Sequence, residues 1–483
     1  MRSLNMGIVR ARTLLTGIIR TTGVIRLLLV CFLLSVTSYC YAEARHYWIE
    51  DLGGLGGRSV SGGYGTINAS GQVVGYSFTS ASAQHAFRTP ASGPMDATSD
   101  LGTAMGSTSV ALGINDAGQA VGYAYNPDAL HAFRTAPNGL ITSESDLGTL
   151  GGSRSFGTAI NASGQAVGDS FLAGVGRHAF RTQPNGKITL DSDLGTLGGL
   201  YSTAYGINVL GQAVGYANLP GDQRAHAFRT EPNGVITAAS DLGVLKQGTS
   251  SRAFGINASG QVVGVSTTYL QSYDHAVRIA AGGVITDASD LGTLGGTQSW
   301  GDGINDLGQV VGSSKMPGDT DEHGFVADWN GPMIDLNSRI SAASGWVVYQ
   351  AHGINNSGQI SGTGIRDGVT HAIRLTPATP GDANGDFKVD FNDLVALAQN
   401  YNAGGGAWAW ERGDFTGDGN VDFSDLVVLA QHYNTGTPDA AFSTDFQAAM
   451  AAVPEPAGAT LALSAAFIVL MRRRRRRGHA RQD

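Results

Sequence analysis

Three short stretches decide the fold. Residues 111–115 read Ala-Leu-Gly-Ile-Asn, residues 119–123 read Gln-Ala-Val-Gly-Tyr and residues 131–135 read His-Ala-Phe-Arg-Thr. Each stretch recurs with substitutions in six other places, and consecutive copies of the histidine lie 46 to 49 residues apart. A period of this length indicates an array of similar supersecondary units. The recurring histidines are His85, His131, His178, His226, His275, His323 and His371.

Each unit is expected to form four antiparallel strands. The first ends in Gly-Ile-Asn, and an Asn-Ala-Ser-Gly type of turn leads to the second, which resembles Gln-Val-Val-Gly-Tyr. The third is His-Ala-Phe-Arg-Thr, and a Pro-Asn-Gly turn such as 137–139 precedes a fourth strand such as 140–147. Four antiparallel strands per unit are typical of a β-propeller blade.

The two ends of the array complement each other. The array begins with residues 46–53, which match the fourth strand of a unit, and ends with residues 371–374, which match a third strand. Pairing the two would close a ring and hide both sheet edges, whereas an open solenoid would need capping repeats. We therefore predict an all-β, seven-bladed propeller over residues 45–377.

Over about residues 50–377 the Gly-Ile-Asn, Gly-Gln-Val-Val-Gly and His-Ala-Phe elements resemble the bacterial extracellular HAF repeat family. That resemblance implies no particular enzymatic activity. A catalytic set needs different residues once, so the repeated His and the Asp of Asp-Leu-Gly are expected to form structural hydrogen bonds and turns. We assign no catalytic residue. Non-repeated residues are better site candidates, and the possible ligand face is Trp300, Trp346, Tyr349 and His352.

Composition narrows the class of protein. Glycine supplies 70 of 483 residues, charged residues only 14% and hydrophobic residues 42%, which fits short strands joined by turns rather than a disordered chain. Five of the 31 basic residues precede residue 44 and seven follow residue 471, so residues 45–453 keep 19 against 36 acidic residues. A net charge near −17 argues against a nucleic-acid partner. Both cysteines lie before residue 44, which excludes a disulfide framework in the body.

The two ends of the chain predict export. Five Arg precede an apolar run from residue 27 to 36, followed by Ala42-Glu43-Ala44, which is typical of a signal peptide (1–44) cut by signal peptidase. Residues 454–477 contain Pro454-Glu455-Pro456, an apolar helix over 457–471 and six Arg. They resemble the PEP-CTERM sorting signal, which implies transient inner-membrane anchoring, then processing by exosortase and delivery to the surface or the medium. A permanent tail anchor is the alternative, though 15 apolar residues are short for one.

Two acidic loops between the repeats and the tail predict calcium binding. Residues 382–393 and 414–425 place oxygen-bearing side chains at loop positions 1, 3, 5, 9 and 12, the spacing of an EF-hand type of loop. The position-7 ligand would be a backbone carbonyl. Two Ca²⁺ ions would order the module, because dense carboxylates repel one another without a cation. The expected ligands are Asp382, Asn384, Asp386, Lys388, Asp390 and Asp393, then Asp414, Thr416, Asp418, Asn420, Asp422 and Asp425.

An apolar helical pattern follows each loop, at 394–401 and 426–433. Loop and helix, repeated twice, resemble a type I dockerin over residues 381–436. The resemblance implies docking to a cohesin-like domain and an association with polysaccharide breakdown. A calcium-stabilised spacer is the alternative, because bulky Phe391 and Phe423 depart from many dockerins. A linker, 437–453, would join the module to the tail.

Together these features predict a secreted or cell-surface binding or scaffold protein of the extracellular polysaccharide matrix. The alternative is a carbohydrate-active enzyme, a glycoside hydrolase or polysaccharide lyase, acting on the propeller. A non-repeated carboxylate pair beside Trp on one face would favour the enzyme. Equivalent repeat residues without such a pair would favour the scaffold.

Overall fold

The structure is a computed structural model of the 483-residue chain. It describes residues 45–57, 66–103, 106–126, 129–174, 176–246, 248–268, 273–404 and 409–433. Two compact units are distinguished. The first is Arg45–Thr379 with Gly385–Phe387, and the second is Pro380–Asn384 with the residues from Lys388 onward.

Several predictions concern segments outside the described residues. These are the signal peptide (1–44), the linker (437–453), the sorting signal (454–477) with its helix over 457–471, and the processing residues Ala42, Ala44, Pro454, Glu455 and Pro456. Within the described ranges, no helix is long and apolar enough to cross a membrane.

The first unit is built almost entirely of short strands. Its first eleven strands are β1 (Tyr47–Asp51), β2 (Val74–Phe78), β3 (Gln84–Arg88), β4 (Ser109–Ile114), β5 (Ala120–Asn126), β6 (Ala129–Arg134), β7 (Gly151–Ile160), β8 (Ala166–Leu172), β9 (Arg177–Arg181), β10 (Ser202–Ile207) and β11 (Ala213–Asn218). The others are β12 (Ala225–Arg229), β13 (Ser251–Ile256), β14 (Val262–Thr267), β15 (Asp274–Ile279), β16 (Ser299–Ile304), β17 (Val310–Lys315), β18 (Glu322–Ala327), β19 (Met333–Asp335), β20 (Trp346–Ile354), β21 (Ile360–Arg366) and β22 (Val369–Pro377).

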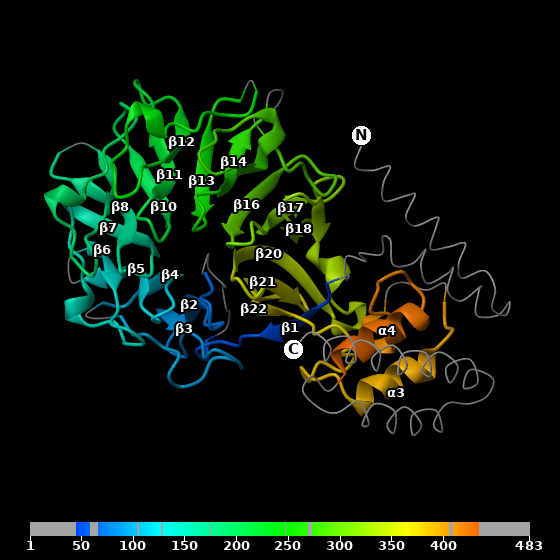
Figure 1. Ribbon diagram of the computed structural model, residues 1–483. Helices are drawn as coiled ribbons and strands as arrows, with labels where there is room; N and C mark the ends of the chain where they lie inside the picture. Colours follow the sequence, from blue (N-terminus) through cyan, green and yellow to red (C-terminus); the bar gives the residue numbers. More distant parts are fainter. Residues whose placement is uncertain are drawn as a thin grey trace, which may run out of the picture. The chain divides into compact units, whose positions relative to one another are not determined.

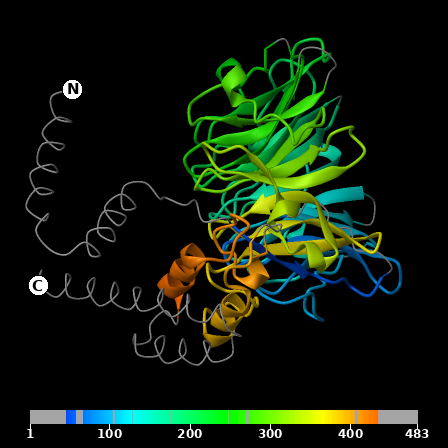
Figure 2. The same ribbon diagram turned by 90° about the vertical axis from the view of Figure 1, so that its right-hand side faces the viewer.

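The described strands pair into seven antiparallel sheets that follow the sequence (Figure 1). In sequence order they are β2-β3, β4-β5-β6, β7-β8-β9, β10-β11-β12, β13-β14-β15, β16-β17-β18-β19 and β20-β21-β22 with β1. Figure 2 shows the same strands turned by 90°. The predicted all-β repeat architecture is therefore present at the level of the sheets.

The prediction of a full fourth strand over 140–147 is wrong. A 3₁₀ turn, Ser143–Ser145, interrupts that segment, and only one bridge, Phe133 to Asp146, joins it to the third strand. The turn forms because Ser145 Oγ accepts the backbone N–H of Thr142 at 3.1 Å, while the Ser145 N–H donates to the Thr142 carbonyl oxygen at 3.0 Å. Four of the seven units share this arrangement, with the other turns at Leu190–Ser192, Ala238–Ser240 and Asp287–Ser289.

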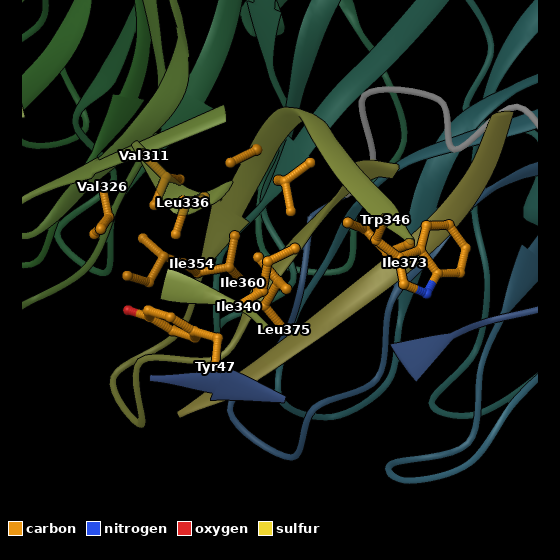
Figure 3. Close-up of a cluster of buried hydrophobic side chains, with 12 residues drawn as sticks. Tyr47, Val311, Val326, Leu336, Ile340, Trp346, Ile354, Ile360, Ile373 and Leu375 are labelled. Atoms are coloured by element: carbon orange, nitrogen blue, oxygen red, sulfur yellow. The ribbon is translucent and has the colours of Figure 1, made fainter. Parts of the chain in front are cut away.

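The first strand of the chain completes the last sheet. β1 pairs antiparallel with β22 from Tyr47 opposite Pro377 to Asp51 opposite Ile373. Figure 3 shows Tyr47 lying among buried residues of the last units, including Ile340 and Leu375. The edges of β1 and β22 thereby cover each other, as the match between residues 46–53 and a fourth strand predicts.

A closed circuit of hydrogen bonds links the seven units. The side-chain amide of Asn68 donates to the backbone oxygen of Asn115, 3.2 Å away, and each later Asn of the Ile-Asn turns donates to the next. The last, Asn355, donates to the backbone oxygen of Asn68 at 3.0 Å. All seven Asn residues are buried. A buried amide without a hydrogen bond would cost folding free energy, and these bonds avoid that cost. The intervening donors are Asn115, Asn161, Asn208, Asn257 and Asn305.

Glycine is required where the second strand of a unit crosses the first. A bulge between Ala111 and Gly113 shifts the register of β4 against β5. A Cβ on Gly122 of β5 would overlap the carbonyl oxygen of Val110. Gly168, Gly215, Gly264 and Gly312 face the same obstacle in their own sheets, which accounts for the Gly in these five Val-Gly pairs.

The second unit contains two helices, α3 (Phe391–Asn400) and α4 (Phe423–His432). Asp390 caps α3, because its carboxylate accepts the backbone N–H of Asn392, and Asp422 caps α4 in the same way. The residues that α3 and α4 bury recur at helical spacing, as the sequence pattern predicts. They include Leu394, Leu397, Leu426 and Leu429.

Candidate functional site

The repeated histidines and aspartates pair with each other inside each sheet. His131 Nδ1 lies 3.0 Å from Asp146 Oδ2, and the carboxylate also accepts the backbone N–H of Gly148 at 2.8 Å. In the last sheet the pair is His371 with Asp51 of β1, at 3.0 Å. The prediction that these residues make structural hydrogen bonds and turns is confirmed. The other pairs are His85–Asp100, His178–Asp193, His226–Asp241, His275–Asp290 and His323–Asp335.

The pKa values of both residues in the His275–Asp290 pair are shifted. The hydrogen bond that His275 donates to Asp290 raises the pKa of His275 despite partial burial of the imidazole. Burial opposes ionisation of Asp290, yet hydrogen bonds from His275 and the Gly292 N–H outweigh it and hold the Asp290 pKa below 3.8. The charged pair is therefore favoured in the folded state.

The arginine of the third strand is also used to join the units. Arg134 Nη1 donates to the carbonyl oxygens of Gly164 and Gly186 in the following unit, at 3.1 and 2.9 Å. Arg374 does the same across the junction of the last and first units, donating to Gly71 O at 2.7 Å. Its Nε and Nη2 also both donate to Oε2 of Glu50 in β1, which forms an ion pair. The repeated polar residues thus hold the array together.

The four residues proposed as a ligand face do not form one exposed surface. Trp346 packs in a buried apolar cluster with Tyr47 and Ile373 (Figure 3). Its ring also meets that of His371 edge-on, with ring centres 5.2 Å apart. His352 is also buried, and its Nε2 lies 3.1 Å from Thr363 Oγ1. Only Trp300 and Tyr349 are partly exposed. Trp346 is therefore a core residue, and its large ring fills space inside the divergent last unit.

A non-repeated polar cluster forms where the sheet of β16–β19 meets β20. Glu322 is largely buried, accepts a hydrogen bond from Gln350 Nε2 at 2.8 Å and pairs with Lys315 Nζ at 3.0 Å. The hydroxyl of Tyr349 lies 3.5 Å from the same carboxylate. Burial disfavours the charged form, but hydrogen bonds from Gln350, Lys315 and Ser313 keep the pKa of Glu322 below 4.5.

Trp300 borders this cluster, which we call the Glu322 cluster. It is the register partner of Ser313, whose hydroxyl hydrogen-bonds Glu322. The arrangement combines an aromatic ring with a carboxylate, an ammonium and an amide, the groups that commonly bind sugar hydroxyls. Sequence reasoning singled out Trp300, Tyr349 and the scarce Glu322. It missed Lys315 and Gln350, which lie in different units.

The acidic loop before Glu322 has a structural role. Asp319 accepts hydrogen bonds from the backbone N–H and the hydroxyl of Thr297, both at 2.8 Å. These bonds lower the pKa of Asp319. Asp319 therefore fixes the loop and does not join Glu322 as a second carboxylate of the cluster.

The two acidic loops of the second unit turn their first and last carboxylates inward. Asp382 and Asp393 are fully buried in the first loop, as Asp425 is in the second, where Asp414 is nearly so. Asp393 accepts the backbone N–H groups of Ala383 and Asp390, both at 2.8 Å. Burial, with the nearby charge of Asp382, raises the Asp393 pKa to about 6 despite these bonds.

The second loop repeats this arrangement. Asp425 accepts the backbone N–H groups of Thr416 and Asp422, and burial raises its pKa to about 6. Thr416 Oγ1 is buried and has no partner at full hydrogen-bond geometry in the described part of the chain, although it lies near the Asp425 carboxylate. The residues fit a hard cation, since buried oxygen donors face like charges. Within the described ranges no three His, Cys, Asp or Glu side chains already form a metal-ligating group.

The remaining predicted ligands are more exposed. In the first loop Asn384, Asp386 and Lys388 are exposed, and Asp390 is half-buried. In the second, Asp418 and Asn420 are exposed and Asp418 accepts the backbone N–H of Asn420 at 2.8 Å. Asp390 and Asp422 also serve as helix caps, so the loop and the helix that follows it share the same carboxylates.

Comparison with known proteins gives distant similarity only. No protein-family model matches the chain, and no curated protein matches it. Among solved structures, a variant of the Aleuria aurantia lectin in complex with Fucα1-6GlcNAc shares 11% identity at a TM-score of 0.27. The match covers 56% of this chain and 94% of the lectin. The lectin variant with α-methyl-L-fucoside shares 11% identity at a TM-score of 0.25, covering 61% of this chain and 96% of the lectin.

Proposed function

We propose that the chain is an exported binding or scaffold protein of the extracellular polysaccharide matrix. In this proposal the seven sheets are the blades of a propeller closed by β1. The tail signal delivers the protein to the surface or the medium after transient anchoring and processing by exosortase. The dockerin-like unit binds two Ca²⁺ ions, and its partner would be a cohesin-like domain.

The single observation that carries polysaccharide binding is the Glu322 cluster. The repeated His, Asp, Asn and Arg side chains are already bonded to one another or to backbone oxygens, so they build the array. Glu322, Lys315 and Gln350 occur once and lie beside Trp300 and Tyr349. Such a set offers acceptors and donors to sugar hydroxyls and ring faces to the apolar side of a sugar.

The calcium-binding residues would act as a structural clamp. Bound Ca²⁺ would neutralise the buried carboxylates of each loop. Asp382 and Asp393 would hold the ion in the first loop, and Asp414 and Asp425 in the second. Since Asp390 and Asp422 cap α3 and α4, ordering the loops would also fix where the helices start.

The test uses the purified full-length chain with Ca²⁺ and a panel of extracellular polysaccharides. Retention on polysaccharide and new reducing or unsaturated chain ends are measured in the same tubes. The proposal predicts retention without cleavage. It predicts weaker retention for Glu322→Gln and unchanged retention for Glu144→Gln, the same change at an exposed glutamate of another unit. New chain ends that disappear with Glu322→Gln would instead establish the enzyme alternative.

A further inference from the structure

A second polar cluster, formed by Asp169, Arg177 and Thr203, lies three units before the Glu322 cluster and at equivalent positions of the repeat. We call it the Asp169 cluster. The position after the Val-Gly of the second strand is Tyr in three units, but it is Asp169 in the third and Ser313 in the sixth. Arg177 and Glu322 both precede the repeated histidine. Thr203 and Gln350 both lie on the first strand of the next unit, opposite its second strand. Only polar residues fill these three positions in the two clusters.

The Asp169 cluster is buried and incompletely bonded. Asp169 is 4% exposed and Thr203 2% exposed. Arg177 Nε lies 3.4 Å from Asp169 Oδ2, an ion pair without hydrogen-bond geometry. Asp169 Oδ2, Arg177 Nε and Thr203 Oγ1 have no partner at full hydrogen-bond geometry among the described residues, although the Thr203 hydroxyl lies close enough to the Asp169 carboxylate to favour its charged form. Burial raises the pKa of Asp169 to about 6, against the opposing effects of the Arg177 charge and the Thr203 side chain.

Buried polar atoms without partners are rare in folded proteins, and each calls for a specific explanation, such as a bound molecule or water. Three such atoms from three different strands converge here. They comprise a carboxylate acceptor, a guanidinium donor and a hydroxyl that can do either. A structural role alone gives no reason to place all three together.

The cluster reaches the surface through aromatic and cationic side chains. Arg177 Nη2 donates to the Tyr216 hydroxyl at 3.0 Å, and the Arg177 side chain is 30% exposed. The rings of Tyr205 and Tyr216 lie 5.9 Å apart, and the guanidinium of Arg252 lies 5.9 Å from the Tyr216 ring centre. Tyr205 and Tyr216 are half-buried and Arg252 is exposed.

We propose that Asp169, Arg177, Thr203 and Tyr216 form a second saccharide site, selective for a neutral sugar with adjacent free hydroxyl groups. The Asp169 carboxylate would accept from one hydroxyl while Arg177 donates to its neighbour, and the Tyr216 ring would contact the apolar face. The sugar is neutral because Asp169 and Arg177 already balance each other's charge. A charged ligand would leave one of them buried without compensation.

This inference rests on the proposed function, since both assign sugar binding to the seams between units, but it concerns different residues. Two sites on one array would hold a long polysaccharide more tightly than either alone. The decisive variant is Thr203→Val, which keeps the side chain's shape and removes only the unpartnered hydroxyl. A binding role predicts no loss of stability, because the hydroxyl has no hydrogen bond of good geometry within the described chain, whereas a structural role predicts a lower melting temperature.

The experiment applies the full-length chain to an array of neutral and uronic-acid oligosaccharides, with melting temperatures measured in parallel. Thr203→Val should weaken binding to neutral oligosaccharides about tenfold, the usual effect of one lost hydrogen bond, without lowering the melting temperature. The matched control is Thr230→Val. The Thr230 hydroxyl accepts the Ala213 N–H at 3.0 Å, so this variant should lower the melting temperature and leave sugar preference unchanged.

The outcomes separate the two proposals. Unchanged binding by Thr203→Val, with weaker binding by Glu322→Gln, would overturn the second site and show that the Asp169 cluster holds water only. Loss of binding in Thr203→Val together with a lower melting temperature would assign the hydroxyl a structural role and also overturn it. If the unaltered chain binds no oligosaccharide on the array, the second site and the proposed function both fail.

Discussion

Closure of the array by β1 can be tested with two equivalent leucines. Leu52 follows β1 and Leu194 belongs to the third unit, and both are fully buried or nearly so. Leu52 N donates to Ala372 O at 3.0 Å, and Leu194 N donates to Ala179 O at 2.9 Å. Leu52 lies in a buried cluster with Ile67, Val73, Phe87 and Ala372, which come from both ends of the array. Leu194 lies in a comparable cluster within the array.

Replacing either leucine with alanine leaves a cavity in a packed cluster. Such changes cost about 2–5 kcal/mol of unfolding free energy. For a unit of about 330 residues the unfolding entropy is about 0.7 kcal/mol per kelvin, so the melting temperature should fall by about 3–7 °C. Because the two sites match in burial and hydrogen bonding, closure predicts falls of similar size for Leu52→Ala and Leu194→Ala.

The assay is thermal unfolding of the full-length chain in Ca²⁺, followed by far-ultraviolet circular dichroism. If β1 does not dock on β22, Leu52 is exposed and its replacement costs nothing. A clear fall for Leu194→Ala with an unchanged melt for Leu52→Ala would therefore refute closure. Deleting residues 46–52 should lower the melting temperature further, since it removes the whole of β1.

Three further predictions concern the His275–Asp290 pair, calcium binding and the circuit of Asn hydrogen bonds. The raised pKa of His275 gives stability that is present below about pH 6.5 and lost as the pH rises through its folded value. The lowered pKa of Asp290 gives stability lost only as the pH falls below 3.8. His275→Asn should therefore destabilise the chain more at pH 5.5 than at pH 8 in denaturant titrations, and an equal loss at both would contradict this. Calorimetric titration should find two Ca²⁺ sites, one of them abolished by Asp425→Ala, and no heat at millimolar Ca²⁺ would reject the assignment. Asn355→Ala and Asn208→Ala should each cost about 1–3 kcal/mol, and a cost at Asn208 alone would mean an open circuit.

The repeat made much of the architecture predictable. Seven copies of one pattern average out local ambiguity, so residues 46–53 could be matched to a fourth strand and paired with residues 371–374. The prediction of a strand over residues 140–147 was wrong, because a strand and a capped 3₁₀ turn can have the same pattern of apolar residues. Only the reciprocal bonds of Thr142 and Ser145 decide between them.

The candidate site was less predictable, because its residues are not repeated. Glu322 could be noticed as a scarce residue, but Lys315 and Gln350 gain meaning only when two sheets bring them together. Trp346 shows the opposite error. A tryptophan in a divergent unit can serve the core or a ligand, and its packing against His371 places it in the core. The Asp169 cluster was invisible in sequence, since one Asp at a Tyr position carries no signal until its neighbours are known.

The central claim is that repeated residues build the array and non-repeated residues bind polysaccharide. Hydrogen–deuterium exchange of the full-length chain, with and without a polysaccharide that it retains, tests this claim most directly. The account predicts protection confined to the strands of the two clusters, above all β17, β18 and β20 around Glu322. Equal protection of the His-Ala-Phe strands in all seven units would contradict it.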